Sequence, residues 1–313
     1  MNLAHLYYFK KLVEVRNYSE AAKELFIAQP TLSLAVSSLE KELGTALVKK
    51  KRNSLELTED GEDFYEAVVK ATNALDNSIA MIQERTQAQH GTIKIGMVYS
   101  VQNQAWSNTI KKYKAKTHGK VQIRWKQGTT ESLMRDLKNG TLDVIFAGVL
   151  GKGDPDVVSV PCFAQGAALL VNKANPLSQR EKISFDDLGS AQIITYRNKK
   201  GPFMKEINDL FANHQNLNVA YDYGDEITLA SMVSADPEIL AVSCYSWLID
   251  AFPEVATIEL AEAPKDFHRF YFSYRKKERL PFVVEEFVQF MRDYDFESVS
   301  EEEVRSHTPM INI

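Results

Sequence analysis

The stretch SEAAKELFIAQPTLSLAVSSLEKEL, Ser19 to Leu43, has the pattern of a helix but carries a proline near its middle. Apolar residues recur at three- and four-residue spacing on both sides of this point, as on one face of a helix. Pro30 inside a helix would remove a hydrogen bond, but it suits a first turn, so a new helix is expected to begin at about Gln29. Ser19 is the expected N-cap of the preceding helix. The stretch therefore predicts two short helices joined by a tight turn.

The second of these helices has two different faces. Its expected core face is Leu32, Val36, Leu39 and Leu43. Its outer face is short-chained or amide-bearing, which lets the backbone approach another molecule closely and still form hydrogen bonds. The outer residues are Gln29, Pro30, Thr31, Ser33, Leu34 and Ser37. Such a pair of helices predicts a helix-turn-helix whose second helix enters a major groove of double-stranded DNA.

A basic hairpin is expected directly downstream, in ALVKKKRNSLELTEDG. Two short apolar runs flank a turn at Asn53-Ser54, as in a small wing. Its four cations, Lys49, Lys50, Lys51 and Arg52, would lie beside the second helix and suit DNA phosphates, and Arg52 is also placed to reach a minor groove. A solvated charge run is the ordinary alternative, and the position next to a helix-turn-helix favours the DNA contact.

Charge is unevenly distributed along the chain. The net charge of the 313 residues is −5, but residues 1–57 alone carry +3. With 44% hydrophobic and 25% charged residues the composition is that of a globular protein of two or three units. No apolar run approaches the ~20 residues that span a bilayer, and the N-terminus lacks a signal-peptide pattern, so we expect a cytoplasmic protein with no membrane partner.

A long helix is expected from Thr58 to about residue 85. Phe64, Val68, Ala71, Leu75 and Ile82 recur at spacing close to 3.5 residues, although Ser78 interrupts the stripe. The stripe can pack on its own domain or pair two chains, and the helix length favours a dimerising linker. The polar stretch RTQAQHG at 85–91 is the expected domain boundary.

Strand, helix, strand, helix and strand follow one another between Thr92 and Gly148, which predicts a parallel sheet covered on both faces, and the same alternation resumes from Ala167. Two α/β lobes joined by crossing strands near residues 161 and 265 fit this order. The fold class is thus α/β with an N-terminal all-α winged helix-turn-helix. The expected units are 1–58 (DNA-binding), 59–90 (linker helix and hinge), 91–161 with 266–296 (lobe I), 162–265 (lobe II) and 297–313 (acidic flexible tail).

A ligand cleft is expected where strands end and helices begin, between the two lobes. In lobe I these positions hold Ser100, Val101, Thr129 and Thr130, and in lobe II they hold Tyr196, Arg197 and Thr228. Helix N-termini favour anions, and an arginine fork suits a carboxylate, so a small organic anion is the expected ligand. Ordinary N-capping is the alternative role for the hydroxyls.

Catalytic and metal-binding signatures are missing from the sequence. There is no H-E-x-x-H, no G-x-S-x-G and no phosphate-binding loop, and the six histidines are scattered. Cys162 and Cys244 have no companion at redox spacing and are expected to be buried thiols. We therefore expect neither an enzyme nor a cofactor or metal site. A small-molecule sensor whose N-terminal unit makes only protein contacts remains the alternative function.

Several segments resemble those of LysR-type transcriptional regulators. YSEAAKEL, QPTLS, LEKELG and LTEDG occur in that family's order and spacing, and LKNGTLDVIFAG, NPLSQREKISFDDL and LASMVSADPEILAVS give weaker support. The resemblance implies a winged helix-turn-helix, a dimerising helix and a two-lobed effector domain similar to periplasmic binding proteins. It implies as partners operator DNA, a small-molecule effector, RNA polymerase and further copies of the chain, as a homodimer or homotetramer.

The resemblance also implies roles for individual residues. Gln29, Pro30, Thr31 and Ser33 match the DNA-contacting start of the recognition helix, Arg52 matches the wing, and Ser100, Thr129 and Thr130 match cleft positions. Leu34 departs from the basic or amide residue of many members. Contact with a thymine methyl group is the expected replacement for a hydrogen bond to a base.

Overall fold

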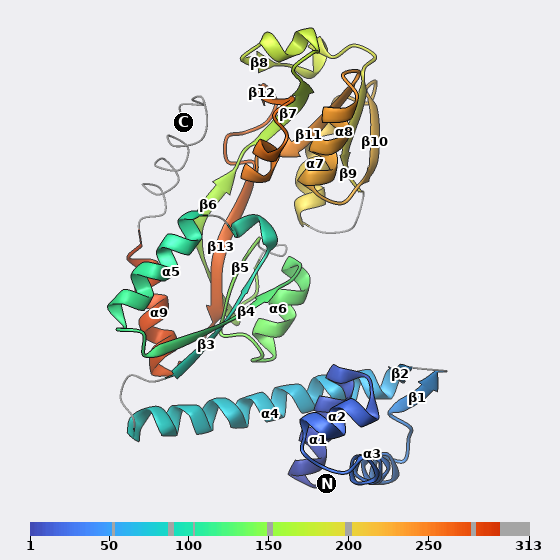
Figure 1. Cartoon of the computed structure of the whole chain (residues 1–313), viewed down its shortest axis with the longest axis vertical. Coiled ribbons are helices and arrows are strands. Elements are labelled where there is room, and N and C mark those ends of the chain that lie inside the picture. Colours follow the sequence, from blue (N-terminus) through green and yellow to red (C-terminus); the bar gives the residue numbers. More distant parts are fainter. Residues whose placement is uncertain are drawn as a thin grey trace.

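The computed structural model describes residues 1–51, 54–86, 91–102, 104–148, 153–197, 202–276 and 280–294 (Figure 1). Arg52, the end of the expected hinge at 87–90 and the expected acidic tail at 297–313 lie outside the described residues. Among the described helices, none is long and apolar enough to cross a membrane.

The N-terminal unit is a three-helix bundle with a small hairpin, and it contains the two helices and the hairpin expected from the sequence. Its elements are α1 (Leu3–Val15), α2 (Tyr18–Glu24), α3 (Gln29–Leu43), β1 (Val48–Lys51) and β2 (Ser54–Leu57). Phe9 and Leu12 of α1 pack on Leu32, Val36 and Leu39 of α3 in one buried cluster. Leu43 was expected in this core but is 38% exposed, because α3 ends there and Gly44 takes the left-handed conformation (φ 73°) as its C-cap.

The N-cap of α2 differs from the expected one. The side chain of Asn17 accepts hydrogen bonds from the backbone N–H groups of Ser19 (2.9 Å) and Glu20 (3.1 Å). Ser19 lies inside the first turn of the helix. Asparagine and serine are comparable N-caps, so residue type alone did not decide between these neighbouring positions.

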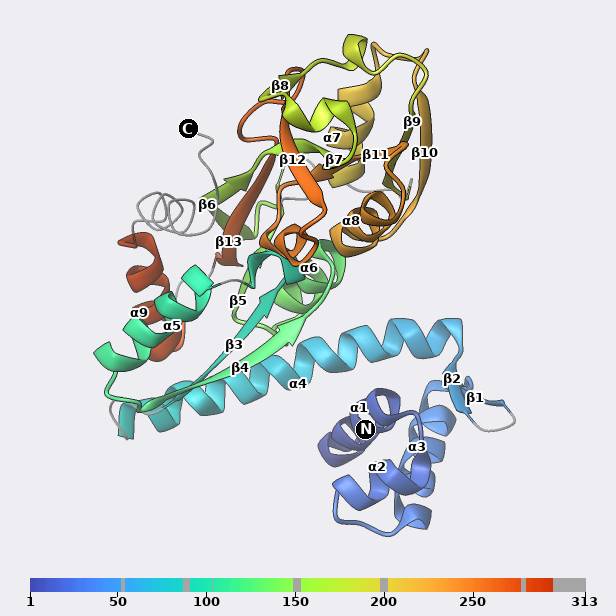
Figure 2. The ribbon, with the colours of Figure 1, turned by 45° about the horizontal axis from the view of Figure 1, so that its top comes forward.

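Helix α4 (Glu59–Thr86) follows the hairpin of this unit and runs below lobe I in both views (Figures 1 and 2). Its Val68 belongs to the core of the N-terminal unit. Of the predicted seam, Leu75 and Ile82 are 37% and 62% exposed, as is the neighbouring Ile79 at 44%. The far half of α4 thus presents apolar side chains that the described part of this chain does not cover.

Lobe I is built on a five-stranded sheet of order β4-β3-β5-β13-β6. Strand β3 runs parallel to β4 and β5, but β13 runs antiparallel to both β5 and β6. The parallel arrangement expected for the first three strands is confirmed, and the antiparallel β13 joins them because the chain returns from the other lobe. The elements are β3 (Gly91–Met97), η1 (Tyr99–Val101), α5 (Gln104–Lys116), β4 (Val121–Gln127), α6 (Thr130–Lys138), β5 (Val144–Ala147), β6 (Val157–Gln165), β13 (His268–Arg275) and α9 (Phe282–Arg292).

Lobe II has a six-stranded sheet of order β10-β9-β11-β7-β12-β8. Strand β9 is parallel to β10 and β11, whereas β7 is antiparallel to β11 and β12, so this sheet is also mixed. The elements are β7 (Ala167–Asn172), η2 (Pro176–Gln179), β8 (Lys182–Ile183), η3 (Phe185–Asp187), β9 (Gln192–Tyr196), α7 (Pro202–Phe211), β10 (Asn218–Tyr223), α8 (Glu226–Ala235), β11 (Ile239–Cys244), η4 (Trp247–Ala251) and β12 (Val255–Leu260).

Strands β6 and β13 connect the lobes as an antiparallel pair (Figure 1). Their register runs from the pair His268–Gln165 to the pair Arg275–Val157. Each strand is thus continuous from one lobe into the other, close to the crossing points expected at 161 and 265. A shift of one lobe against the other must bend or slide this pair.

The N-cap of α2 provides a stability test. Asn17→Ala leaves the N–H groups of Ser19 and Glu20 without their acceptor and should destabilise α2 by ~1 kcal/mol. Ser19→Ala, the matched control, should change stability by less than about 0.5 kcal/mol. Native-state hydrogen exchange of the α2 amides measures both. Equal effects of the two substitutions would contradict the assignment of Asn17 as the cap.

Candidate nucleic-acid interface and ligand cleft

The outer face of α3 is uncovered from Gln29 to Ser37. Gln29, Pro30, Thr31, Leu34 and Ser37 are exposed, and Ser33 is half-buried between them. Leu34 is 72% exposed, a large value for an apolar side chain in a short helix. The structure thus places all six predicted residues of this helix on its accessible side, while Leu32, Val36 and Leu39 fix the opposite side in the core.

The turn between α2 and α3 contains a residue that sequence reasoning missed. Phe26 has φ 56° and is 96% exposed. Its N–H donates to Lys23 O (3.1 Å) and that of Ile27 to Ala22 O (3.0 Å), which is the bonding pattern of a Schellman motif. Glycine or asparagine normally fills the left-handed position of this motif. Here an exposed phenylalanine occupies it, three residues before the start of α3.

The hairpin is held against α3 by Glu40. Its Oε1 accepts from the backbone N–H groups of Leu47 (2.9 Å) and Val48 (3.3 Å), which fixes where β1 begins. Lys49 is exposed and lies opposite Glu56 in the β1–β2 register. Lys50 and Lys51 belong to the same strand, but their side chains, like the whole of Arg52, lie outside the described part of the structure. The described geometry therefore places the basic strand next to α3.

The predicted cleft residues of lobe I have different environments. Ser100 is in the middle of the short helix η1, whose N-cap is Val98, so it does not start a helix as expected. Val101 is 2% exposed and belongs to the core of lobe I, which leaves it no surface for a ligand. Thr129 is the N-cap of α6, as expected, and its side chain accepts from the N–H of Ser132 (3.3 Å). Thr130 follows it, half-buried, as the first residue of α6.

The predicted cleft residues of lobe II are also unequal. Tyr196 is only 4% exposed, and its hydroxyl accepts from Cys244 N (3.0 Å) and lies 2.9 Å from Ser243 Oγ. Arg197 is exposed, and its guanidinium donates to the carbonyl of Asp222 (3.2 Å and 3.3 Å). Thr228 is exposed and donates its hydroxyl to Asp225 Oδ1 (2.9 Å). Tyr196 is therefore a core residue, and Arg197 is bound to its own lobe.

Glu226 joins the two lobes and was missed by sequence reasoning. It is the first residue of α8 and is 4% exposed. Its carboxylate accepts from the hydroxyls of Tyr99 in lobe I and of Tyr196 in lobe II (2.9 Å for the latter). Burial, with the negative charge of Glu226 as a second cause, raises the pKa of both tyrosines far above 10. Both hydroxyls thus remain protonated donors.

A second contact between the lobes involves His268 at the start of β13. Its Nδ1 lies 2.6 Å from Glu206 Oε2 of α7, and its ring packs edge-on against Phe203 and Phe270. A Cβ built on Gly148 would lie 3.4 Å from this ring and 3.7 Å from the Thr130 hydroxyl, so Thr130 and His268 face one small gap. The lobe boundary thus carries two carboxylates, those of Glu206 and Glu226.

Neither metal binding nor thiol chemistry is supported by the described residues. Among them, no group of three or more His, Cys, Asp or Glu side chains is arranged to hold a metal ion. Both cysteines are buried and free, and burial raises the pKa of Cys162 to about 12 and that of Cys244 well above 9. At neutral pH both side chains are therefore protonated thiols.

Comparison with known proteins gives matches across both parts of the chain. Residues 3–62 match the family model for bacterial regulatory helix-turn-helix proteins of the lysR family, and residues 86–295 match the LysR substrate binding domain. The transcriptional regulator CatR of Pseudomonas putida is 31% identical over 68% of this chain and 72% of its own length. The regulator BenM of Acinetobacter baylyi is 29% identical over 68% and 70%.

A structural comparison agrees at the level of the fold. The structure of full-length CbnR complexed with its target DNA superimposes with a TM-score of 0.67, over 93% of this chain and 99% of CbnR, at 19% identity. At that identity the match shows a shared architecture: an N-terminal helix-turn-helix, a long helix and two α/β lobes.

The contact between Tyr99 and Glu226 can be tested by hydrogen exchange. Tyr99→Phe removes a donor from a buried carboxylate, and a hydrogen bond to a charged group contributes ~1.5–3 kcal/mol. We expect the amides of η1 and of the first turn of α8 to exchange roughly tenfold faster or more. Tyr221→Phe, on the half-buried strand β10 of lobe II, is the control. Unchanged exchange in Tyr99→Phe would show that this contact does not hold the lobes.

Proposed function

The chain belongs to the LysR family of bacterial transcriptional regulators, and on that premise we propose that α3 and the β1–β2 hairpin bind operator DNA under the control of a small molecule bound between the lobes. The observation that carries the DNA-binding half is the uncovered face of α3 between Gln29 and Ser37. Its short side chains allow a major-groove approach, and the basic strand beside it suits phosphates. Because the proposed partner is chromosomal DNA, we propose a cytoplasmic location.

We propose a division of roles within the DNA-binding surface. Gln29 and Ser33 read base edges, Leu34 contacts a thymine methyl group, and Pro30, Thr31 and Ser37 line the approach. The cations at positions 49 to 52 bind phosphates. To this set we add Phe26, since an exposed aromatic ring held in a strained backbone position just before α3 is best explained by contact with the DNA.

We propose that the effector binds at the boundary of the lobes beside Ser100, Thr129, Thr130 and Thr228. The organic anion expected from the sequence stays a prediction. The N-terminus of α6, capped by the neutral Thr129, favours a bound anion, whereas the carboxylates of Glu206 and Glu226 repel one. Relatives of this chain are regulators, and we propose no enzymatic activity and no cofactor.

We further propose that the chain acts as a homodimer or homotetramer, with RNA polymerase as an additional partner. The exposed side chains of Leu75, Ile79 and Ile82 on α4 are the proposed surface between copies. The domain bounds expected from the sequence, with the DNA-binding unit ending near residue 58 and the lobes exchanging near 161 and 265, are part of this proposal. A sensor that binds no DNA is the competing function, and the next experiment separates the two.

Substitutions at Gln29 and Lys49 should affect DNA binding in different ways. Gln29→Ala should weaken the free energy of binding to the operator by ~1–3 kcal/mol, if the amide makes a bidentate contact with a base. Binding to random DNA should change little. Lys49→Ala should weaken binding to both DNAs and reduce the salt slope by about one unit. Titrations of operator and random duplexes at several salt concentrations measure this. Wild-type protein without salt-dependent DNA affinity would refute the DNA-binding function itself.

Phe26→Asn should separate stability from DNA affinity. Asparagine tolerates the left-handed conformation better than phenylalanine, so the melting temperature should stay equal or rise. Operator affinity should fall roughly fivefold, since an apolar contact of tens of Å² contributes ~1 kcal/mol. Each operator thymine is also replaced by uracil, one at a time, which removes its methyl group. A methyl group that Phe26 contacts is identified where the affinity losses from uracil and from Phe26→Asn are not additive. Undiminished affinity of Phe26→Asn would remove Phe26 from the interface.

A further inference from the structure

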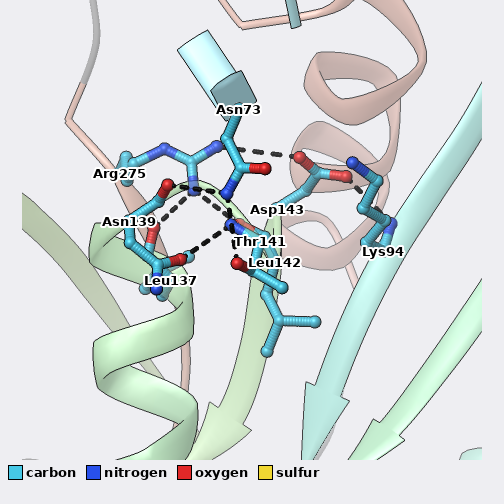
Figure 3. A network of polar contacts seen from close by, with 8 residues as sticks. All are labelled: Asn73, Lys94, Leu137, Asn139, Thr141, Leu142, Asp143 and Arg275. Carbon is cyan, nitrogen blue, oxygen red and sulfur yellow. Dashed lines mark hydrogen bonds and ion pairs between the residues drawn. The ribbon is translucent and has the colours of Figure 1, made fainter. Parts of the chain in front are cut away.

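Asn73 is a buried amide in the middle of α4, with an exposed fraction of 5%. Its Oδ1 accepts from Lys10 Nζ of α1 (2.8 Å). Its Nδ2 donates to the carbonyl of Asn139 (2.9 Å) and to Thr141 Oγ1 (3.1 Å), both in the turn between α6 and β5 of lobe I (Figure 3). One side chain of the linker helix is therefore hydrogen-bonded to the DNA-binding unit with one end and to lobe I with the other.

The turn that receives Asn73 is shaped for close contact. Asn139 Oδ1 accepts from the N–H of Thr141 (3.0 Å), and Gly140 between them has φ 80°. A Cβ built on Gly140 would lie 3.4 Å from Asn73 Cβ and 3.5 Å from Asn77 Nδ2. Glycine thus meets both the conformational requirement and the close approach of α4 at this position.

The same turn is held from inside lobe I by Arg275. This arginine ends β13, is 7% exposed, and donates through Nη1 to the carbonyls of Leu137, before the turn, and of Leu142, at its end (Figure 3). Its Nη2 lies 3.7 Å from Asp143, whose other oxygen accepts from the backbone N–H of Lys94 on β3. The guanidinium thus fixes the position of the turn relative to β13.

Strand β13 extends from this turn to the lobe boundary. Arg275 is its last residue and His268, which contacts Glu206 of lobe II, is its first. The strand pairs with β6 from His268 to Arg275 and with β5 from Tyr271 to Tyr274. A change in lobe arrangement that shifts β13 therefore also shifts Arg275 and the two carbonyls that it binds.

The contact of α4 with lobe I is open next to Asn73. One to two turns earlier in α4, a cavity separates α4 from α6, lined by Glu66 and Lys70 on one side and by Glu131, Arg135 and Lys138 on the other. On its opposite face α4 is tied to α1, through Tyr7 to Asp76 (2.6 Å) and Lys10 to Thr72 (3.2 Å). Because these bonds hold α1 on α4, the bonds of Asn73 to the turn contribute to how this pair of helices lies on lobe I.

We propose that the turn at residues 139–142 is a docking surface for α4. A shift of β13 is then transmitted to the DNA-binding unit through Asn73. The turn, Asn73 and Lys10 then form one continuous polar path from Arg275 to α1. The regulatory consequence rests on the DNA-binding function proposed above, whereas the docking itself does not.

The docking is tested first without DNA. Asn73→Ala in the full chain removes both donors to the turn, and the amides of residues 139–142 and of the middle of α4 should exchange at least about fivefold faster. Asn77→Ala is the matched control, because it has the same residue type and lies one turn further along α4 against the same Gly140. Equal exchange in the two variants would overturn the docking role, whether or not the protein binds DNA.

The transmission is tested by a double-mutant cycle on operator affinity. Arg275→Lys keeps the charge but loses the forked contact with two carbonyls, and should change operator Kd by about fivefold or more. In the Asn73→Ala background the same substitution should have no further effect. Thr141→Val, which removes one acceptor of Asn73 at little change in volume, replaces Arg275→Lys if that variant does not fold. Additive effects, or no effect of the first substitution with Asn73 intact, would overturn the proposal. Wild-type protein that binds no operator would instead refute the proposed function.

Discussion

One buried amide that must be hydrogen-bonded sets how the DNA-binding unit and lobe I lie on α4. Thr72 and Asn73 are both buried on α4, and a buried polar group must be hydrogen-bonded. Thr72 meets this need inside the helix, where its hydroxyl donates to the carbonyl of Val68 (2.8 Å). Asn73 has an acceptor and two donors, and satisfies them with Lys10 on one side and the turn at 139–142 on the other. The DNA-binding unit and lobe I are therefore fixed at the same level along α4.

The parts of the fold that the sequence predicts are those set by local chemistry. Pro30 marks the start of α3, and the apolar spacing of α3 and α6 identifies their buried faces. In the segment LTEDG, local geometry explains why residue 61 is a glycine and residue 58 a threonine. A Cβ on Gly61 would lie 2.0 Å from the carbonyl of Leu47, and the Thr58 hydroxyl bonds both the Gly61 N–H and the Ala46 carbonyl. Only glycine allows the hairpin to meet the first turn of α4 this closely.

The features that sequence reasoning missed depend on partners distant in the chain or on conformation. Glu226 contacts Tyr99 across 127 positions, and neither residue has a neighbour that signals the pair. Strand β13 is antiparallel because the chain returns from lobe II, which alternation of strands and helices does not reveal. Short strands such as β8 have too few residues for a periodic signal. The positive φ of Phe26 was hidden because phenylalanine rarely adopts it.

The electrostatics of the lobe boundary depend on which side chains bind the free backbone N–H groups at each helix N-terminus. A helix N-terminus attracts anions in general, but that of α8 carries its own, since Asp225 Oδ1 accepts from the Thr228 N–H (2.8 Å) and Glu226 occupies the first turn. Tyr99 reaches across from lobe I to donate to Glu226. A ligand that displaces Tyr99 must supply another donor, because Glu226 would otherwise keep only its bond from Tyr196, and a buried acceptor oxygen left unsatisfied costs ~1–3 kcal/mol. A carboxylate supplies none, so the organic anion that we propose is expected beside Thr129 in lobe I, whereas a hydroxyl or amino group is the chemistry expected to take the place of Tyr99.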